Sequence, residues 1–230
     1  MVIGNGMIAK AFESYRHQDN FVIFASGVSD SAHAGDAAFA RELKLVADSI
    51  KQNPGKVFVY FSTCSISDPC MQETAYVQHK IKMEDFIKKN HSPYVVFRLT
   101  NPVGNTANTH TFFNYFIKHI REKETFQVWK NAARNIIDLD DVFSICNEIL
   151  QEKLFTDTVI NIENPVNYSV PFIIHTIEKH VGSTGNYSMV EKGGAPVIDT
   201  SLIDPLFKKF NINFDKNYLP GLLQKYFPYK

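Results

Sequence analysis

Two groups of side chains in this sequence have types and a spacing suited to proton transfer at a carbon–oxygen bond. The stretch FSTCSISDP, residues 61–69, ends an apolar run with five hydroxyl or thiol side chains, and Tyr76 and Lys80 follow it. Four residues apart on a predicted helix, these two share a face. An ammonium beside a phenol favours the phenolate, which lowers the tyrosine pKa toward a range useful for acid–base work. A solvated surface pair is the simpler alternative, and the nearby hydroxyls favour the chemical one.

The chain opens with a second feature that suggests a ligand. MVIGNGMIAKAF predicts a short strand, a glycine turn and a helix, and contains the pattern Gly4-x-Gly6-x-x-Ala9. Glycines let the backbone approach a pyrophosphate, and the unpaired N–H groups of the helix that follows favour negative charge. An ordinary strand-to-helix turn would have the same pattern, so alone it is a weak signal.

Strands and helices alternate along the rest of the chain. The run KVFVYFSTCSI is almost continuously apolar, as strands buried on both faces of a parallel sheet are. The pattern predicts an α/β protein with a Rossmann-like, doubly wound parallel sheet. Strands are expected in the segments NFVIFASG, KVFVYFSTCSI, PYVVFRLTNPVG and TDTVINIENP, and helices in AAFARELKLVADSIKQ, ETAYVQHKIKMEDFIKKN, HTFFNYFIKHIREK and SVPFIIHTIEKHVG.

Two regions late in the chain complete the expected organisation. NIIDLDDVFSICNEILQE predicts a short extended piece and a helix begun by Asp140 or Asp141. The last forty residues predict irregular chain with one or two short helices. We therefore expect a core over residues 1–165 and a small C-terminal substrate-side cap over residues 166–230.

Composition excludes several classes of function. The 230 residues carry 24 Lys+Arg against 24 Asp+Glu, without the basic excess of nucleic-acid or anionic-membrane binders. No apolar run approaches the roughly 20 residues of a membrane span, and the N-terminus lacks signal-peptide features, so we expect a cytoplasmic protein. The three cysteines, Cys64, Cys70 and Cys146, favour free thiols, and no Cys/His spacing predicts a metal site.

Taken together, these motifs resemble one family. The chain looks like an extended short-chain dehydrogenase/reductase of the NAD-dependent epimerase/dehydratase type, whose members act on nucleotide sugars. The matching pieces run in family order over about residues 1–165: GNGMIA, VIFASGV, FST with YVQHK, RLTNPVG and ARNIIDLDDV.

The resemblance implies roles for particular residues. Thr63 would orient the substrate oxygen, Tyr76 would be the acid/base, and Lys80 would tune Tyr76 and bind the nicotinamide ribose of NAD or NADP. Asn101 would lie against the nucleotide sugar. Arg134 would bind its diphosphate, because a planar guanidinium can donate two hydrogen bonds to it at once. A salt bridge of Arg134 with Asp138 or Asp140 is the alternative. The cofactor loop and the strand beside it would contribute Gly4, Gly6, Met7, Ile8, Ala25, Ser26 and Gly27.

One departure from the family affects the cofactor site. Between the glycine loop and NFVIFASG, roughly 35 to 45 residues of strands and helices are missing by ordinary element lengths. The first strand should then lie at a sheet edge. Arg16 and His17 would favour NADP if they met a 2′-phosphate, and solvated helix-end charges are an equal alternative.

The residues after Thr63 discriminate among the family's reactions. Dehydratases of this family carry an Asp-Glu pair there, whereas this chain has Cys64 and Ser65. Cys64 is similar instead to the cysteine of GDP-fucose synthase-type 3,5-epimerase/4-reductases, with His110 as the partner that returns a proton. A small buried cysteine is the plainer reading.

Three functions therefore stay open. The first is an NAD(P)-dependent reductase or epimerase of a nucleotide-activated, 4-keto-deoxy sugar for surface-glycan synthesis, acting as a homodimer through the helix at residues 74–89. The second is a catalytically silent binding or regulatory relative. The third is an enzyme that grips a tightly bound cofactor mainly at its nicotinamide end.

Overall fold

A five-stranded parallel sheet forms the centre of the molecule. The computed structural model describes residues 1–29, 35–106 and 111–228. The strand order is β1-β2-β3-β4-β8, and every neighbouring pair is parallel. The strands are β1 (Val2–Ile3), β2 (Phe21–Phe24), β3 (Val57–Thr63), β4 (Tyr94–Leu99) and β8 (Thr158–Ile162). This confirms the predicted Rossmann-like class.

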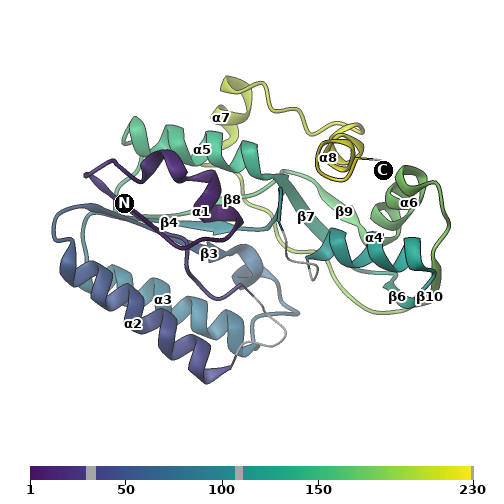
Figure 1. The fold of residues 1–230 in the computed structure, drawn as a ribbon, viewed down its shortest axis with the longest axis horizontal. Coiled ribbons are helices and arrows are strands. Elements are labelled where there is room, and N and C mark those ends of the chain that lie inside the picture. The colour runs from purple at the N-terminus through teal and green to yellow at the C-terminus, as the bar shows by residue number, and fades with distance from the viewer. Residues whose placement is uncertain (30–34, 107–110, 229–230) are drawn as a thin grey trace.

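Helices cover both faces of this sheet. Alternate strand residues point to opposite sides, so apolar side chains on each face need a layer of helices to bury them. Phe21 and Ile23 pack with α1 (Met7–Ala11) and α5 (Leu139–Gln151) on one face. Val22 and Phe24 pack on the other face with α2 (Asp36–Gln52) and α3 (Ala75–Asn90). Figure 1 shows α1 and α5 above the sheet and α2 and α3 below it.

The first crossover differs in hand from the next two. The connections from β1 to β2, β2 to β3 and β3 to β4 all step the same way across the sheet. The first passes over the face of α1, whereas the other two pass over the face of α2 and α3. Two such connections on opposite faces must have opposite hands, and about 98% of parallel crossovers are right-handed. The β1–α1–β2 connection is thus the exceptional one.

The change of face between the first and second connections also affects the edge of the sheet at which the strands end. The chain leaves β1 toward one face and β2 toward the other, and in open α/β sheets ligands bind beside the carboxyl ends of strands where such a change occurs. Among the described residues β1 has only β2 as a neighbour, so the expected edge position of the first strand is confirmed.

A second lobe lies beside the carboxyl end of the sheet (Figure 1). Its apolar cluster is built around Phe116, Ile120, Ile173 and Leu222. The elements of this lobe are β5 (Asn101–Val103), α4 (Phe112–Glu122), β6 (Thr125–Trp129), β7 (Ala133–Asp138), β9 (Asn167–Ser169), α6 (Val170–Val181), β10 (Asn186–Val190) and α8 (Tyr218–Tyr226). This cluster draws on both sides of residue 165, and a boundary between two units at that position stays a prediction.

Several local expectations differ from the structure. The single strand expected over PYVVFRLTNPVG is divided at Thr100 into β4 and β5, which enter different sheets. The helix expected to begin at Asp140 or Asp141 has Asp138 as its N-cap, since that carboxylate accepts from the Asp140 N–H. The small strands β6, β9 and β10 were not predicted. Short α7 (Asp204–Lys209) and α8 agree with the expected short C-terminal helices.

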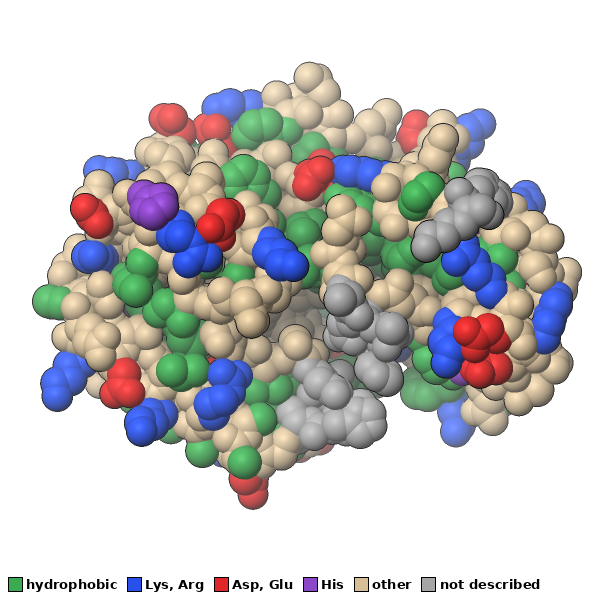
Figure 2. All heavy atoms as spheres, in the orientation of Figure 1, with side chains coloured by type: hydrophobic (Ala, Val, Ile, Leu, Met, Phe, Trp, Pro, Cys, Tyr) green, Lys and Arg blue, Asp and Glu red, His purple; other side chains and the backbone are tan. Residues whose placement is uncertain are grey.

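Charges of both signs lie on one face of the molecule. Figure 2 shows acidic and basic side chains interspersed on the face it presents. In the described residues, no helix is both long and apolar enough to cross a membrane.

Candidate active site

The Tyr76 and Lys80 side chains meet the end of β3 as the spacing predicts. Thr74 caps α3 by accepting from the Val77 N–H, which places Tyr76 in the first turn and Lys80 one turn later. The Lys80 Nζ lies 5.9 Å from the centroid of the Tyr76 ring. Thr63, the last residue of β3, lies close enough to the Tyr76 phenol for its side chain to lower the pKa of that phenol. The three predicted residues thus form one group.

Lys80 has a partner that the sequence did not indicate. The Nζ donates to Glu42 Oε1 at 3.0 Å and to Tyr60 Oη at 3.0 Å. Glu42, on α2, is fully buried, and Lys80 is 2% exposed. The ammonium is therefore paired with a carboxylate from a different helix.

This pairing changes the expected acidity of Tyr76. Burial raises the pKa of Tyr76 to about 12, with the hydrogen bond from Thr63 lowering it and the charge of Glu42 raising it. The expected lowering by Lys80 is not seen, since burial of the phenol dominates and Lys80 is itself paired with the Glu42 carboxylate. At neutral pH the phenol keeps its proton.

Most of the polar side chains at the end of β3 have structural partners. Ser62 Oγ donates to Glu84 Oε1 at 2.6 Å, and the Ser65 N–H donates to Thr63 Oγ1 at 3.1 Å. Cys64 Sγ donates to the Arg98 carbonyl at 3.1 Å. Of this hydroxyl-rich stretch, Thr63 is the residue that contacts Tyr76.

Cys64 is held as a neutral thiol. Burial, followed by the nearby Glu163 carboxylate, raises the pKa of Cys64 well above its ordinary value. The thiolate needed for a base is therefore disfavoured. His110, its suggested partner, lies outside the described residues.

The glycine loop brings the end of β1 against the end of β2. Gly4 has φ 127°, and a Cβ there would lie 2.4 Å from the Ala25 carbonyl oxygen. The Ala25 N–H donates to the Ile3 carbonyl at 2.8 Å. Gly6 precedes α1, and a Cβ there would meet nothing within 4 Å. The close approach at Gly4 and the open space at Gly6 fit a loop that receives a phosphate group.

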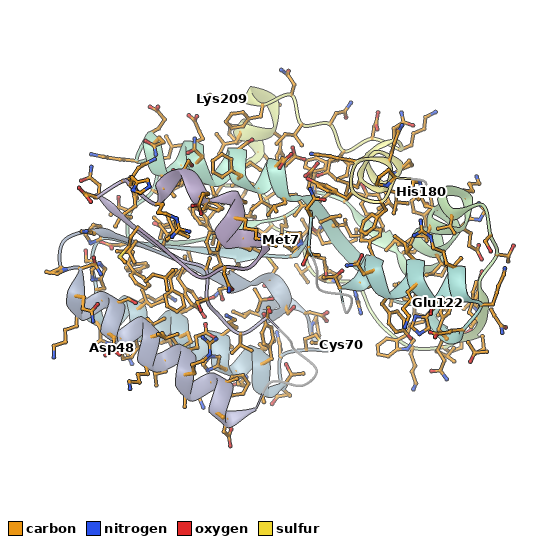
Figure 3. All side chains as sticks on the ribbon, viewed as in Figure 1. Met7, Asp48, Cys70, Glu122, His180 and Lys209 are labelled. Atoms are coloured by element: carbon orange, nitrogen blue, oxygen red, sulfur yellow. The ribbon has the colours of Figure 1, made fainter. Side chains whose placement is uncertain are left out.

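The predicted cofactor residues after β2 lie next to the lysine. A Cβ on Gly27 would stand 2.8 Å from Lys80 Nζ and 2.9 Å from Glu42 Oε1. Ser26 accepts from Arg41 through its carbonyl at 2.9 Å. Met7 and Ile8 begin the short helix α1, and Figure 3 shows Met7 near the middle of the molecule, toward the second lobe. The predicted set is therefore assembled around the ends of β1 and β2.

Arg134 lines a cavity of about 360 Å³ in the second lobe. Its guanidinium lies 6.0 Å from the Phe112 ring centroid, and burial lowers its pKa. The suggested salt bridges do not form, because Asp138 and Asp140 each pair with Lys225 at 2.7 Å. The cavity is lined by Phe112, Tyr115, Phe116, Gln127, Trp129, Ala132, Arg134 and Val170.

Other predicted residues take different positions. Asn101 lies in β5 and donates to the Asn135 carbonyl at 2.7 Å. Arg16 is exposed and pairs with Glu13 through Nε and Nη2. In the described residues, no group of three or more His, Cys, Asp or Glu could hold a metal ion.

Two parts of the site were missed from the sequence. The first part is Glu42, which lies in an expected helix but was not singled out; its place on the same face as Val46 and Ile50 was the available signal. The second part is the aromatic run FFNYF of α4, in which Phe113 is buried in the second cluster whereas Phe112 and Tyr115 line the cavity.

Fold and site together define a dinucleotide-fold enzyme class with a Thr-Tyr-Lys group at the carboxyl ends of the strands. The model of the NAD dependent epimerase/dehydratase family matches residues 6–162. The chain belongs to this family, as the resemblance implied, and so to the enzymes of the short-chain dehydrogenase type.

Solved structures of similar fold come from several bacteria. The Bordetella bronchiseptica enzyme WbmG in complex with NAD and UDP is 18% identical, with a TM-score of 0.69 over 98% of this chain and 80% of that one. UDP-glucuronic acid 4-epimerase from Bacillus cereus is 17% identical, with a TM-score of 0.70 over 95% and 76%. A dTDP-4-dehydrorhamnose reductase from Bacillus anthracis, in complex with NADP, is 16% identical, with a TM-score of 0.70 over 94% and 84%. No curated protein matches the sequence.

Proposed function

We propose that this protein is an NAD(P)-dependent reductase or epimerase of a nucleotide-activated sugar. The observation that carries the proposal is the contact of Thr63 with Tyr76 beside Lys80, directly under Gly27 at the end of β2. A pure binding protein has no need of a phenol placed in this way.

The residues around the ends of β1 and β2 fit a dinucleotide. Gly4 and Gly6 would receive the pyrophosphate, and the strand end at Ala25–Gly27 would border the nicotinamide half. Two N–H bonds of the Lys80 ammonium go to Glu42 and Tyr60, which leaves one for a ribose hydroxyl. When bound, the nicotinamide supplies or accepts the hydride.

The second lobe would hold the substrate's nucleotide. The cavity beside Arg134 offers aromatic rings for stacking a base, the Gln127 amide for hydrogen bonds, and a guanidinium for a diphosphate. WbmG with UDP and the UDP-glucuronic acid 4-epimerase have similar folds, which supports a nucleotide sugar as substrate. Asn101 is proposed to contact the sugar.

The protein's own residues would then manage the proton. Tyr76 keeps its proton at neutral pH, so it would donate to the oxygen of a sugar carbonyl as that oxygen becomes a hydroxyl. Thr63 would hold the same oxygen in place. A stored proton suits carbonyl reduction, and we therefore place reduction of a 4-keto-deoxy sugar first, with a role in surface-glycan synthesis.

The epimerase/reductase alternative, with Cys64 and His110, is less favoured. It requires Cys64 to act as a base, and the buried, hydrogen-bonded thiol opposes ionisation. C4 epimerisation through Thr63, Tyr76 and Lys80 alone needs no such group.

The first experiment is a titration of the protein with NADH and NADPH, followed by nicotinamide fluorescence. Saturable binding that weakens in Lys80→Ala is expected from a working oxidoreductase. Oxidation of the bound cofactor in a screen of nucleotide 4-keto sugars would then identify the substrate.

Absence of binding by either cofactor at millimolar concentration, with none retained through purification, would contradict the proposal. The silent binding relative would then be the better account. A cofactor retained through purification, but not exchanged, would favour the tightly bound form.

A further inference from the structure

We propose that Glu42 is a positioning residue of this site, whose buried carboxylate holds the Lys80 ammonium beneath Gly27 and keeps it charged. The inference rests on the proposed function for its catalytic consequence. Its structural content concerns two side chains of the cofactor-free protein and can be tested without substrate.

The contacts of Glu42 fix its carboxylate from four sides. Oε2 accepts from the Val28 N–H at 2.7 Å and lies 3.1 Å from His79 Nε2. Oε1 accepts from Tyr60 Oη at 2.5 Å and from Lys80 Nζ at 3.0 Å. These partners come from the segment after β2, from β3 and from α3, so the carboxylate of Glu42 connects three parts of the chain at the point where the ammonium lies.

Burial makes the charge of Lys80 depend on this partner. Burial lowers the pKa of Lys80, and the charge and hydrogen bond of Glu42 act in the opposite direction. Burial would likewise raise the pKa of Glu42, but hydrogen bonds from His79, Tyr60 and Val28 and the charge of Lys80 bring it to about 2. Glu42 is thus ionised across the neutral range and stabilises the cation.

Among the other described groups near the ammonium, the charge of Glu84 also raises the pKa of Lys80, but it ranks after both contributions of Glu42. Tyr60 and Tyr76 are phenols whose pKa values burial raises, and both stay neutral. Glu84 lies one turn further along α3 but is engaged in a two-pronged pair with Arg98, at 2.8 and 2.7 Å. His79 contacts Glu42 rather than Lys80.

The catalytic consequence is a pH limit set by Lys80. A charged lysine can donate to a ribose hydroxyl and supports proton transfer at Tyr76, whereas a neutral amine does so poorly. Without Glu42, burial would discharge Lys80 at a lower pH, so activity would be lost earlier as pH rises.

The test is ¹³Cε-lysine NMR of the cofactor-free protein against pH, with the Lys80 resonance assigned by its absence from Lys80→Arg. We expect Glu42→Gln to lower the Lys80 titration midpoint by about one unit or more, and Glu42→Asp to lower it less. The matched control is Glu148→Gln on α5. This change removes the carboxylate that pairs with Lys209 and should leave the Lys80 midpoint unchanged.

The same variants are then compared by pH profile. In Glu42→Gln the alkaline limb of kcat/KM should move down by the same interval, about tenfold in rate per unit on that limb, with near-normal activity at acidic pH. A Lys80 midpoint that does not move, or an equal loss of activity at every pH, would overturn the inference. If the wild-type protein binds no dinucleotide, the proposed function fails, but the NMR titration still decides the role of Glu42. If Glu42→Gln does not fold, the shift of the Lys80 midpoint in Glu42→Asp decides it instead.

Discussion

Tyr76 and Lys80 show what residue spacing does and does not predict. The i, i+4 spacing correctly placed both side chains on one face of a helix, because that relation is local. The pKa of Tyr76 depends first on burial, then on Thr63 and on the charge of Glu42, which lies 34 positions earlier on another helix. No local pattern predicts that burial or the contact of Glu42 with Lys80. The group could be predicted from the sequence, whereas its electrostatics could not.

Removing the Tyr76 hydroxyl is the sharpest test at this scale. Tyr76→Phe should lower kcat by about 10²- to 10⁴-fold, because the proton donor is lost while the ring stays in place. Steady-state cofactor oxidation measures it. The control is Tyr94→Phe, the same change at the opposite end of the sheet, which should keep its activity. Equal losses in both variants would count against a proton-transfer role.

The hydroxyls at the end of β3 add a second lesson about residues. The sequence marked the stretch as reactive, and the structure assigns Ser62 to Glu84 and Cys64 to the Arg98 carbonyl. Small polar side chains at a strand end serve buried partners as readily as substrates. Only the fold separates Thr63 from its neighbours.

At the scale of elements, the two glycines of the first loop should separate stability from binding. Gly4→Ala should destabilise the protein by about 2–4 kcal/mol, since φ is 127° and the new Cβ would meet the Ala25 carbonyl. Gly6→Ala should cost at most about 1 kcal/mol but weaken dinucleotide binding, because its Cβ would fill the open space. Thermal unfolding and NADH titration measure the two effects, and similar behaviour of both variants would contradict this account.

The start of α5 carries a pH-dependent contact with α8. Tyr218 Oη donates to Asp141 Oδ2 at 2.7 Å, and burial raises the pKa of Asp141 to about 6. A carboxyl with a raised pKa binds its proton more tightly in the folded state. Stability should therefore fall as pH rises from about 4 through about 6, and then level off.

Asp141→Asn should abolish that decline, since an amide keeps the acceptor for Tyr218 and cannot ionise. Urea unfolding at several pH values measures it. Asp48→Asn, on the exposed side of α2 (Figure 3), is the control and should leave the decline in place. A variant curve parallel to wild type would refute the assignment.

Elements differed in how well the sequence predicted them. Long helices such as α2 and α3 were correct because their apolar faces repeat over several turns. β6 and β10 were missed because, in the described chain, they form a separate two-stranded sheet whose partners lie about sixty residues apart. The division of β4 from β5 at Thr100 also depends on β7, whose pairing no local pattern shows.

At the scale of the whole molecule, we expect a homodimer through α3. Leu43 on the adjacent α2 is 42% exposed, and apolar side chains of this kind are common in the centres of interfaces. Sedimentation should give a dimer, and Leu43→Lys should shift it toward the monomer. Leu154→Lys, at 45% exposure in the segment after α5, is the control. A wild-type monomer at micromolar concentration would refute the expectation.

The edge position of β1 has a consequence for local stability. A two-residue strand held by one neighbour is the part of a sheet most ready to open without global unfolding. The glycine loop follows directly from that strand, so local opening and ligand capture should be coupled. Amide hydrogen exchange in β1 should be the fastest in the central sheet, and bound dinucleotide should slow it more than exchange in β3 or β4.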